Sequence, residues 1–204
     1  VEMSGAPDSE VNAMVSDIEE MDRIIGQFLD FGRGAPQEPP QTLDLVQFTR
    51  EVIEPYRLRG VDLRLHAPES LLGAARALSL RRALANLIDN ALRYAGEDMA
   101  LDISVGVQEG DLCIEVADRG PGIPESEVER MRHPFTRLEK ARSNAKGAGL
   151  GLAIVERVMR AHGGRLDLLP REGGGLRAIL RLPGSGNASV RARMQSAHQE
   201  GSDR

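Results

Sequence analysis

Two stretches of the chain alternate apolar and other residues, and this alternation limits the fold more than any other feature. They are "LDISVGVQEGDLCIEVAD" at 101–118, which turns at Gly110, and "GRLDLLPREGGGLRAILRLP" at 164–183. A period of two predicts strands that bury only one face, so we expect each stretch to form a β-hairpin. A sheet built from such hairpins needs a second layer to cover its apolar face.

Three segments with helical spacing can supply that layer. We expect helices over 43–58, 77–95 and about 150–162, and a further strand in "VDLRLHA" between the first two helices. Helices on one face of a sheet form two layers. The sequence therefore predicts an α/β fold, a two-layer α/β sandwich.

The N-terminal part has a different period. Its apolar residues are spaced alternately three and four apart, which is typical of a heptad seam on a helix that packs against another helix. We favour a bundle with a second helix over docking on the chain's own domain, because a linker rich in Gly and Pro follows. The seam consists of Val11, Met14, Ile18, Met21, Ile25 and Phe28. The expected organisation is a helix over 1–34, a linker over 35–42, the main domain over 43–183 and a disordered tail over 184–204.

Composition narrows the classes of function. The chain has 204 residues and a net charge of −5, and an acidic balance argues against nucleic-acid binding, which needs a basic surface. No apolar run reaches the ~20 residues of a membrane span, so we do not expect this chain to contact a membrane. The single Cys113 excludes a disulfide framework, and its apolar neighbours predict a buried structural thiol. These features fit a cytoplasmic setting, and a first residue of Val indicates a piece of a longer protein.

The helix expected over 77–95 carries polar residues on a packed surface. Asn86 and Asn90 in "NLIDNALRYA" are four apart and share one helix face, with Arg93 and Tyr94 on the next turn. Taken alone, such a pair is more often solvated decoration than a site. The apolar residues around it demand a reason for the polar ones, however. Carboxamide oxygens can bind Mg²⁺ where phosphates supply the negative charge.

A carboxylate followed by glycines ends the first hairpin. In "ADRGPGIP", Asp118 is followed by Gly120 and Gly122. One interpretation is an Asp that caps a turn. The other is an acceptor for the exocyclic amine of a base, with glycines that let a flat ring approach the backbone.

The stretch "AKGAGLGLA" at 145–153 places three glycines where a helix begins. Either the glycines allow tight packing, or backbone N–H groups and the helix dipole bind a phosphate. A run of basic residues precedes them and fits a polyphosphate: Arg132, Arg137, Lys140, Arg142 and Lys146. Phe135 is apolar in this polar stretch, and we expect it to anchor the base of the loop.

Four segments together resemble the N, G1, F and G2 boxes of bacterial sensor histidine kinases, in the family's order. They are "NLIDNALRYA", "DRGPGIP", "HPFTR" and "GAGLGLAIV". The resemblance covers about residues 43 to 183, and the leading helix is similar to the second helix of the family's dimerisation hairpin, of the osmosensor-like subclass. It implies a Bergerat-type ATP-binding fold, with a mixed sheet covered by helices on one face, as in the gyrase, Hsp90 and MutL ATPases.

The resemblance also implies roles for single residues. Asn90, helped by Asn86, would hold Mg²⁺, Asp118 would accept the adenine amine, and the glycine-rich loop would form a movable lid over ATP. Arg93 and Tyr94 would contact phosphate and ribose or base. The implied nucleotide-binding set is Asn86, Asn90, Arg93, Tyr94, Asp118, Gly120, Gly122, Ile123, Phe135, Arg137, Lys140, Gly147, Gly149, Leu150, Gly151 and Leu152.

One departure from the family pattern affects the chemistry. The phosphoacceptor histidine is missing, because His66, His133, His162 and His198 all lie outside its usual sequence context, and we expect surface or structural roles for them. The resemblance implies a protein-histidine kinase that transfers the γ-phosphoryl group of ATP to a histidine outside this chain. Its implied partners are a second copy, through the leading helix, and the receiver domain of a response regulator, and the full protein would be anchored in the bacterial inner membrane.

Two other classes of function stay open. One is a nucleotide-binding scaffold that dimerises without chemistry. The other is an ATP-hydrolysing clamp of the gyrase or Hsp90 kind, which would carry a catalytic Glu on the asparagine helix. Here Ala85 and Asp89 precede the two asparagines, so we consider the clamp the weaker alternative.

Overall fold

A computed structural model of the chain describes residues 14, 15, 18, 21, 25, 26, 38–95, 100–137 and 148–184. Its elements, in order, are β1 (Gln41–Asp44), α2 (Leu45–Leu58), β2 (Leu63–His66), β3 (Leu72–Ala75), α3 (Ala77–Ala95), β4 (Leu101–Gln108), β5 (Asp111–Ala117), α4 (Glu125–Met131), α5 (Gly151–Ala161), β6 (Arg165–Pro170) and β7 (Leu176–Leu182). None of the helices among these residues is long and apolar enough to cross a membrane.

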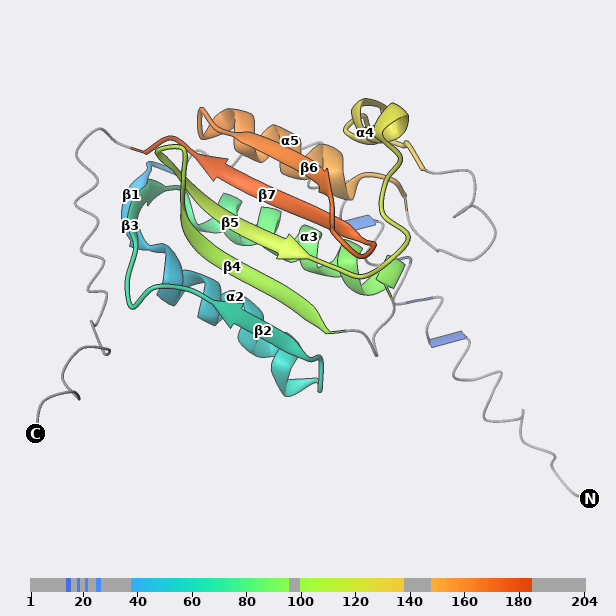
Figure 1. The fold of residues 1–204 in the computed structure, drawn as a ribbon, viewed down its shortest axis with the longest axis horizontal. Coiled ribbons are helices and arrows are strands. Elements are labelled where there is room, and N and C mark those ends of the chain that lie inside the picture. Colours follow the sequence, from blue (N-terminus) through green and yellow to red (C-terminus); the bar gives the residue numbers. More distant parts are fainter. Residues whose placement is uncertain are drawn as a thin grey trace, which may run out of the picture.

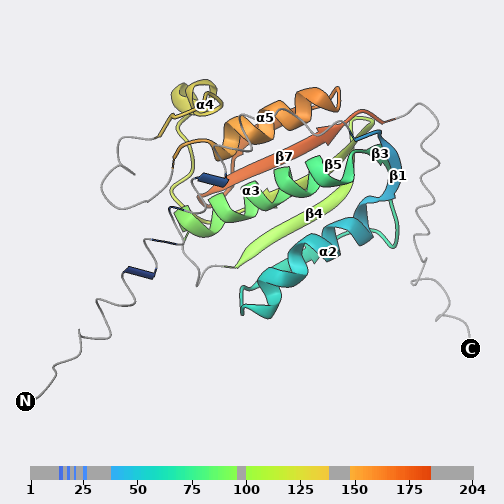
Figure 2. The ribbon, with the colours of Figure 1, turned by 180° about the vertical axis from the view of Figure 1, so that it is seen from behind.

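Five strands form a mixed sheet in the order β2-β4-β5-β7-β6. β2 runs parallel to β4, and the other neighbours are antiparallel. Helices α2, α3 and α5 cover one face of this sheet, as Figures 1 and 2 show from opposite sides. The predicted two-layer α/β sandwich is thus confirmed.

The core lies between the two layers because the strands alternate as predicted. Leu101, Ile103 and Val105 of β4 point to the helices and are at most 4% exposed. The same parity holds in β5, where Leu112 and Ile114 belong to this core. The helices contribute their own apolar stripes, so that one cluster connects both layers.

Most predicted elements are found close to their expected bounds. The helix over 77–95 matches α3 to the residue, and the first hairpin turns at Gly110, where φ is +86°. Helix α2 begins at Leu45 and not at 43, because Asp44 accepts hydrogen bonds from Val46 N at 2.9 Å and Gln47 N at 3.4 Å and thereby caps the helix.

The structure differs from the predicted elements in three places. Gln41 and Thr42 belong to strand β1, so the linker expected over 35–42 is shorter at its C-terminal end. β1 pairs with β3 in a separate two-stranded sheet that the sequence did not reveal. Helix α4 was also missed, because its seven residues bury only Met131 and show no helical period.

The leading helix is described only at some positions. Met14, Val15, Ile18, Met21, Ile25 and Gly26 are helical. The seam positions among them are exposed, from 51% for Ile25 to 66% for Met14. Val11 and Phe28 of the predicted seam, and the tail from residue 185 onward, lie outside the described residues.

Candidate functional site

Four segments that are distant in the sequence meet at one end of the two layers. They are the C-terminal part of α3, the turn after β5, the β6–β7 turn and the first residues of α5. The contacts are close at three glycines. An added Cβ at Gly120 would lie 3.1 Å from the Tyr94 carbonyl oxygen, at Gly151 3.0 Å from Asn90 Oδ1, and at Gly175 2.0 Å from the Asp118 carbonyl oxygen. Backbone therefore packs directly on side chain or backbone at this corner.

The two asparagines of α3 have different surroundings. Asn86 is 9% exposed, and its Nδ2 donates to the Arg82 carbonyl oxygen one turn earlier at 2.9 Å. Asn90 is half-buried, and its carboxamide faces the start of α5 at Gly151. The interpretation as solvated decoration is wrong for Asn86. Of the pair, Asn90 is the residue whose carboxamide lies beside a helix N-terminus.

Asp118 is the most buried carboxylate of the corner, with 7% of its surface exposed. Its Oδ1 accepts hydrogen bonds from Gly120 N at 2.8 Å and from Leu176 N at 3.2 Å. Burial raises the pKa of this carboxyl, whereas the two hydrogen bonds and the positive charge of Arg171 act to lower it. The interpretation as a turn cap is confirmed for Oδ1, whereas the role of Asp118 as an acceptor for a base stays a prediction.

Gly120 and Gly122 let the turn after β5 pass between α3 and the β6–β7 turn. Gly120 lies against the last turn of α3, and Gly122, with φ of +68°, lies against the backbone of Gly175, where a Cβ would be 2.8 Å from the carbonyl oxygen. Ile123 is half-buried and packs on the core. A left-handed conformation and this close approach together require glycine at 122.

The start of α5 is closed by a pair of unusual backbone conformations. Gly149 has φ of +69° and Phe135 has φ of +62°, and Phe135 N donates to the Gly149 carbonyl oxygen at 2.9 Å. The expectation that the Phe135 ring anchors the loop is wrong, because the side chain is 65% exposed. Backbone, and not the ring, holds this point together. Non-glycine residues at positive φ carry strain that clusters at functional sites.

Other predicted site residues differ in how they can act. Leu150 and Leu152 are 1% and 9% exposed and belong to the core, so their side chains are not available to a ligand. Arg93, Tyr94 and Arg137 are half-buried at this end of the molecule. Lys140 and Gly147 lie outside the described residues.

The described histidines have structural or surface positions, as expected. His162 Nε2 accepts from the backbone N–H of Arg76 at 3.0 Å, and Nδ1 lies 2.8 Å from the Val158 carbonyl oxygen, which assigns the proton to Nδ1. His66 and His133 are exposed. His198 lies outside the described residues.

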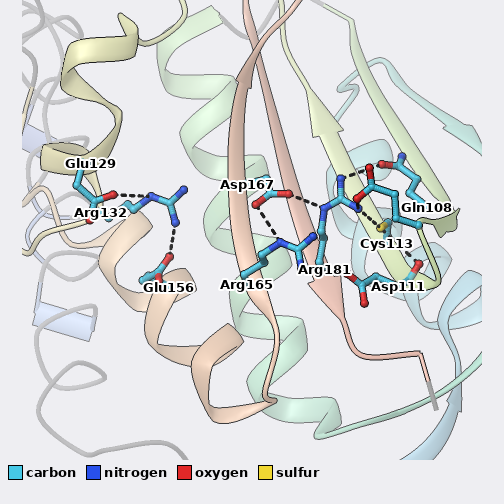
Figure 3. A network of polar contacts seen from close by, with 10 residues as sticks. Gln108, Asp111, Cys113, Glu129, Arg132, Glu156, Arg165, Asp167 and Arg181 are labelled. Carbon is cyan, nitrogen blue, oxygen red and sulfur yellow. Dashed lines mark hydrogen bonds and ion pairs between the residues drawn. The ribbon is translucent and has the colours of Figure 1, made fainter. Parts of the chain in front are cut away.

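Figure 3 shows two polar networks, of which one joins α4 to α5 and the other lies on the sheet near the turn at Gly110. Arg132, after α4, donates to Glu156 of α5 at 3.0 Å and so ties these helices together. On the sheet face away from the helices, Arg181 binds Asp167 and lies 3.7 Å from the sulfur of Cys113. Cys113 is 2% exposed, and burial raises the pKa of its thiol, so it is the buried structural thiol that the sequence predicted.

A metal ion at this corner would find the carboxamide oxygens of Asn86 and Asn90 as candidate ligands. Within the part of the chain that the structure describes, no three His, Cys, Asp or Glu side chains are grouped to hold an ion. A protein site of this kind brings no negative charge of its own, so the ion's other ligands must supply it. The donor set fits Mg²⁺ only together with phosphates.

Sequence reasoning missed the part of the site contributed by the second hairpin. Arg171 donates to the carbonyl oxygens of Ala117 and Asp118, and Gly175 is packed on Asp118. The run "EGGG" was visible as a turn. Its contact with the end of β5 arises from the pairing of β5 with β7, which local patterns do not reveal.

Comparisons with known proteins agree with this geometry. Residues 75–186 match the family described as histidine kinase-, DNA gyrase B-, and HSP90-like ATPase. The sensor protein CutS of Streptomyces coelicolor is 38% identical over 128 residues, which are 61% of this chain and 30% of CutS. The chain thus spans about a third of the length of the curated relative.

Two solved structures share the fold. The histidine kinase domain of the E. coli osmosensor EnvZ is 34% identical to this chain, with a TM-score of 0.57. The match covers 82% of this chain and 100% of that domain. Full-length ShkA in complex with AMPPNP has a TM-score of 0.69 and 24% identity, covering 93% of this chain and 41% of ShkA. The mixed sheet with helices on one face is the fold of these ATP-binding domains.

Proposed function

Because this chain belongs to the family of histidine kinase-, DNA gyrase B- and HSP90-like ATPases and carries the ATP-binding domain of a bacterial sensor histidine kinase, we propose that the corner between α3, α5 and β5 binds Mg–ATP for phosphoryl transfer to histidine. The observation that carries the proposal is the contact of the Asn90 carboxamide with Gly151, at the first residue of α5. This contact supports the proposal, because a carboxamide oxygen lies beside a helix N-terminus whose first residue has no side chain.

The base is recognised at Asp118 in this proposal. Its buried carboxylate accepts from the exocyclic amine of adenine and would face the carbonyl oxygen of guanine. Gly120 and Gly122 shape the surface on which the ring lies, and Ile123 adds an apolar contact. Burial of Asp118 supports such a role, because an acceptor shielded from water discriminates more strongly than an exposed one.

The phosphates are bound at the start of α5. The first backbone N–H groups of an α-helix have no acceptor within the helix, and the helix dipole favours negative charge there. Arg93, Tyr94, Phe135, Arg137, Lys140 and Gly147 complete the proposed nucleotide-binding set. The residues that would hold Mg²⁺ are Asn90 and, on the turn before it, Asn86. Bound there, the ion would neutralise charge on the phosphate oxygens.

The chemical step depends on positioning. Phosphoryl transfer needs the γ-phosphate aligned with the acceptor more than it needs a protein base. We propose that the acceptor histidine lies on another helix of the full protein, that the leading helix pairs with a second copy, and that a response regulator receives the phosphoryl group. Anchoring of the full protein in the inner membrane belongs to the same proposal.

The hydrolysing clamp is disfavoured by the surroundings of Asp89. Asp89 immediately precedes the proposed metal ligand Asn90 in the sequence, and its Oδ1 accepts a hydrogen bond from the Tyr56 hydroxyl at 2.9 Å. A carboxylate engaged with α2 on this side of α3 is poorly placed to activate a water at the phosphates. A scaffold without chemistry differs from the kinase only in the transfer step.

Calorimetry and transfer of γ-labelled phosphate test the proposal together. The chain should bind ATP more tightly with Mg²⁺ than without it, Asn90→Ala should remove that difference, and a separately supplied hairpin with the histidine should acquire acid-labile label. The chain itself should stay unlabelled. Asn86→Ala is the matched variant, and we expect a smaller effect, because the Asn86 amide is bonded to its own helix. ATP binding without label on the hairpin would favour the scaffold.

A further inference from the structure

Arg171 joins the β6–β7 turn to the end of β5. Its Nη1 donates to the carbonyl oxygen of Ala117 at 3.2 Å and to that of Asp118 at 3.3 Å. Its Nη2 forms an ion pair with Asp102 at the start of β4, and the side chain is only 17% exposed. The ladder between β4 and β5 ends at the pair Asp102 and Ala117. The guanidinium therefore adds hydrogen bonds at the point where the ladder stops.

The same turn also contacts Asp118 through its backbone. Gly175 has φ of +113°, and a Cβ there would lie 2.0 Å from the Asp118 carbonyl oxygen. Leu176 exchanges hydrogen bonds with Asp118, since Asp118 N donates to the Leu176 carbonyl at 2.9 Å and Leu176 N donates to the carboxylate at 3.2 Å. Arg171 and the glycine turn thus hold the residue by its backbone and its side chain.

These contacts decide which oxygen of Asp118 can meet a ligand. Oδ1 already accepts two backbone N–H groups, from Gly120 and Leu176. Among the described residues, no donor is bonded to Oδ2, so this oxygen has capacity for a further donor. Its direction follows from the fixed end of β5. A shift of that end would turn Oδ2 away.

The positive charge of Arg171 also acts on the ionisation of Asp118. The charged or titratable side chains that the structure describes around Asp102 and Asp118 come from four places. They are Arg64 and His66 from β2, Asp102 from β4, Arg119 from the turn after β5, and Arg171. Burial raises the pKa of Asp118, and the charge of Arg171 opposes this effect. Asp102 in turn neutralises part of the charge of Arg171, because the two form an ion pair.

We propose that Arg171 is a positioning residue for base selection: it holds the end of β5 so that Oδ2 of Asp118 meets the exocyclic amine of adenine, and its charge favours the ionised carboxylate. The inference rests on the proposed function, because it assumes that Asp118 meets a base. The alternative is that Arg171 and Asp102 only stabilise the fold. A positioning role changes the base preference and the pH profile of nucleotide binding, whereas a purely stabilising role changes neither.

The first experiment compares three variants of the full chain by calorimetry with ATP and GTP from pH 5 to 8. Arg171→Gln should weaken ATP binding by about tenfold at pH 7 and leave GTP binding nearly unchanged, so the preference for ATP falls. The acid limb of the pH profile, which is the loss of ATP binding as the pH falls, should also move to higher pH, because Asp118 loses a nearby positive charge. Arg171→Lys keeps the charge but not the fork of donors, so it should restore the acid limb and only part of the affinity.

The matched control is Arg177→Gln. Arg177 forms a two-pronged ion pair with Glu115 on the same sheet, at 2.7 and 2.8 Å. Within the described part of the chain, its side chain forms no hydrogen bond or ion pair with Asp118. We expect it to leave both nucleotide affinities unchanged. An equal loss in this control, or ATP affinity and a pH profile like those of the unaltered chain in a folded Arg171→Gln, would overturn the proposal.

A second variant covers the case in which Arg171→Gln does not fold. Asp102→Asn leaves the hydrogen bonds of Arg171 to the carbonyl oxygens and frees its charge to act on Asp118, so the acid limb should move to lower pH. A limb that stays or moves to higher pH contradicts the inference.

Nuclear magnetic resonance of the Asp118 carboxyl carbon separates this inference from the proposed function. Measured without nucleotide, its titration midpoint should rise in Arg171→Gln, and an unchanged midpoint overturns the coupling whether or not ATP binds. If the unaltered chain binds neither nucleotide, the proposed function fails and base selection with it. If it binds ATP and Arg171→Gln changes nothing, only the role of Arg171 fails.

Discussion

Replacement of Gly151 by alanine separates the stability of this fold from its proposed ligand binding. Gly151 is the first residue of α5 and has an ordinary helical conformation, so alanine brings no backbone strain. The new Cβ would lie 3.0 Å from Oδ1 and 3.1 Å from Nδ2 of Asn90. Such contacts are shorter than ordinary van der Waals separations by a few tenths of an ångström. The carboxamide must therefore turn or move.

The stability effects largely cancel. Glycine to alanine in a helix gains about 0.5–1 kcal/mol, with the smaller value expected at a first helical position. Turning Asn90 by about 30° away from its rotamer costs about 0.5–1.5 kcal/mol. We expect the free energy of unfolding to change by no more than about 1 kcal/mol. The affinity for Mg²⁺ has no compensating gain, because the substitution displaces the proposed ligand oxygen of Asn90.

The assay is calorimetric titration of ATP with and without Mg²⁺, combined with urea unfolding of the same samples. In Gly151→Ala the gain in ATP affinity from Mg²⁺ should fall by about tenfold, which corresponds to about 1.4 kcal/mol. Gly106→Ala is the matched control, because Gly106 lies in β4 with no atom within 4 Å of an added Cβ. An unchanged Mg²⁺ effect in Gly151→Ala would refute the assignment of Asn90 as a metal ligand.

Three further predictions concern stability. Ser79→Ala should raise the free energy of unfolding by about 1 kcal/mol, because this residue is 1% exposed and its hydroxyl has no partner among the described residues; urea unfolding measures it. Tyr56→Phe should lower it by about 1–2 kcal/mol through loss of the bond to Asp89, and an unchanged midpoint would show that this bond is not needed. Asp44 caps α2. Burial acts to raise the pKa of its carboxyl, but its hydrogen bonds bring the pKa below the ordinary 3.8. Its contribution to the free energy of unfolding is therefore present above pH 3.8 and is lost as the pH falls further. In Asp44→Asn, melting temperatures at pH 7 and pH 3 should therefore differ less than in the unaltered chain.

Helices with a clear apolar stripe and strands with strict alternation could be predicted from the sequence. Helix α3 and the hairpin around Gly110 were predicted almost to the residue, because each has a strong local period and a clear terminator. Elements without such signals were missed. Strand β3 reads "LGAA", which has little preference for a strand, and it forms because β1 lies beside it.

The residues of the site, too, could be predicted only where a short local motif indicated them. Asn90 and Asp118 were predicted from short motifs, since the chemistry and its sequence neighbours lie together. Arg171 was not, because it reaches Asp118 across 53 positions of the chain and acts through the backbone of another strand. The Phe135 ring was placed wrongly for a related reason. A backbone with φ of +62° turns the side chain outward, and no local pattern indicated that conformation.

The two helices of the site are fixed at the end opposite to it. Where α3 begins, the Arg76 guanidinium donates to the Ala161 carbonyl at the end of α5 at 2.6 Å, and His162 accepts the Arg76 backbone N–H. Glu38 accepts from Leu78 N at 3.0 Å, so the segment that enters the domain is joined to the same end. Polar bonds thus hold α3 and α5 together at this end, whereas at the other end they meet through Asn90 and Gly151. Glycine at the start of α5 fits this arrangement, because a side chain there would displace the Asn90 carboxamide while the helices stay held at the other end.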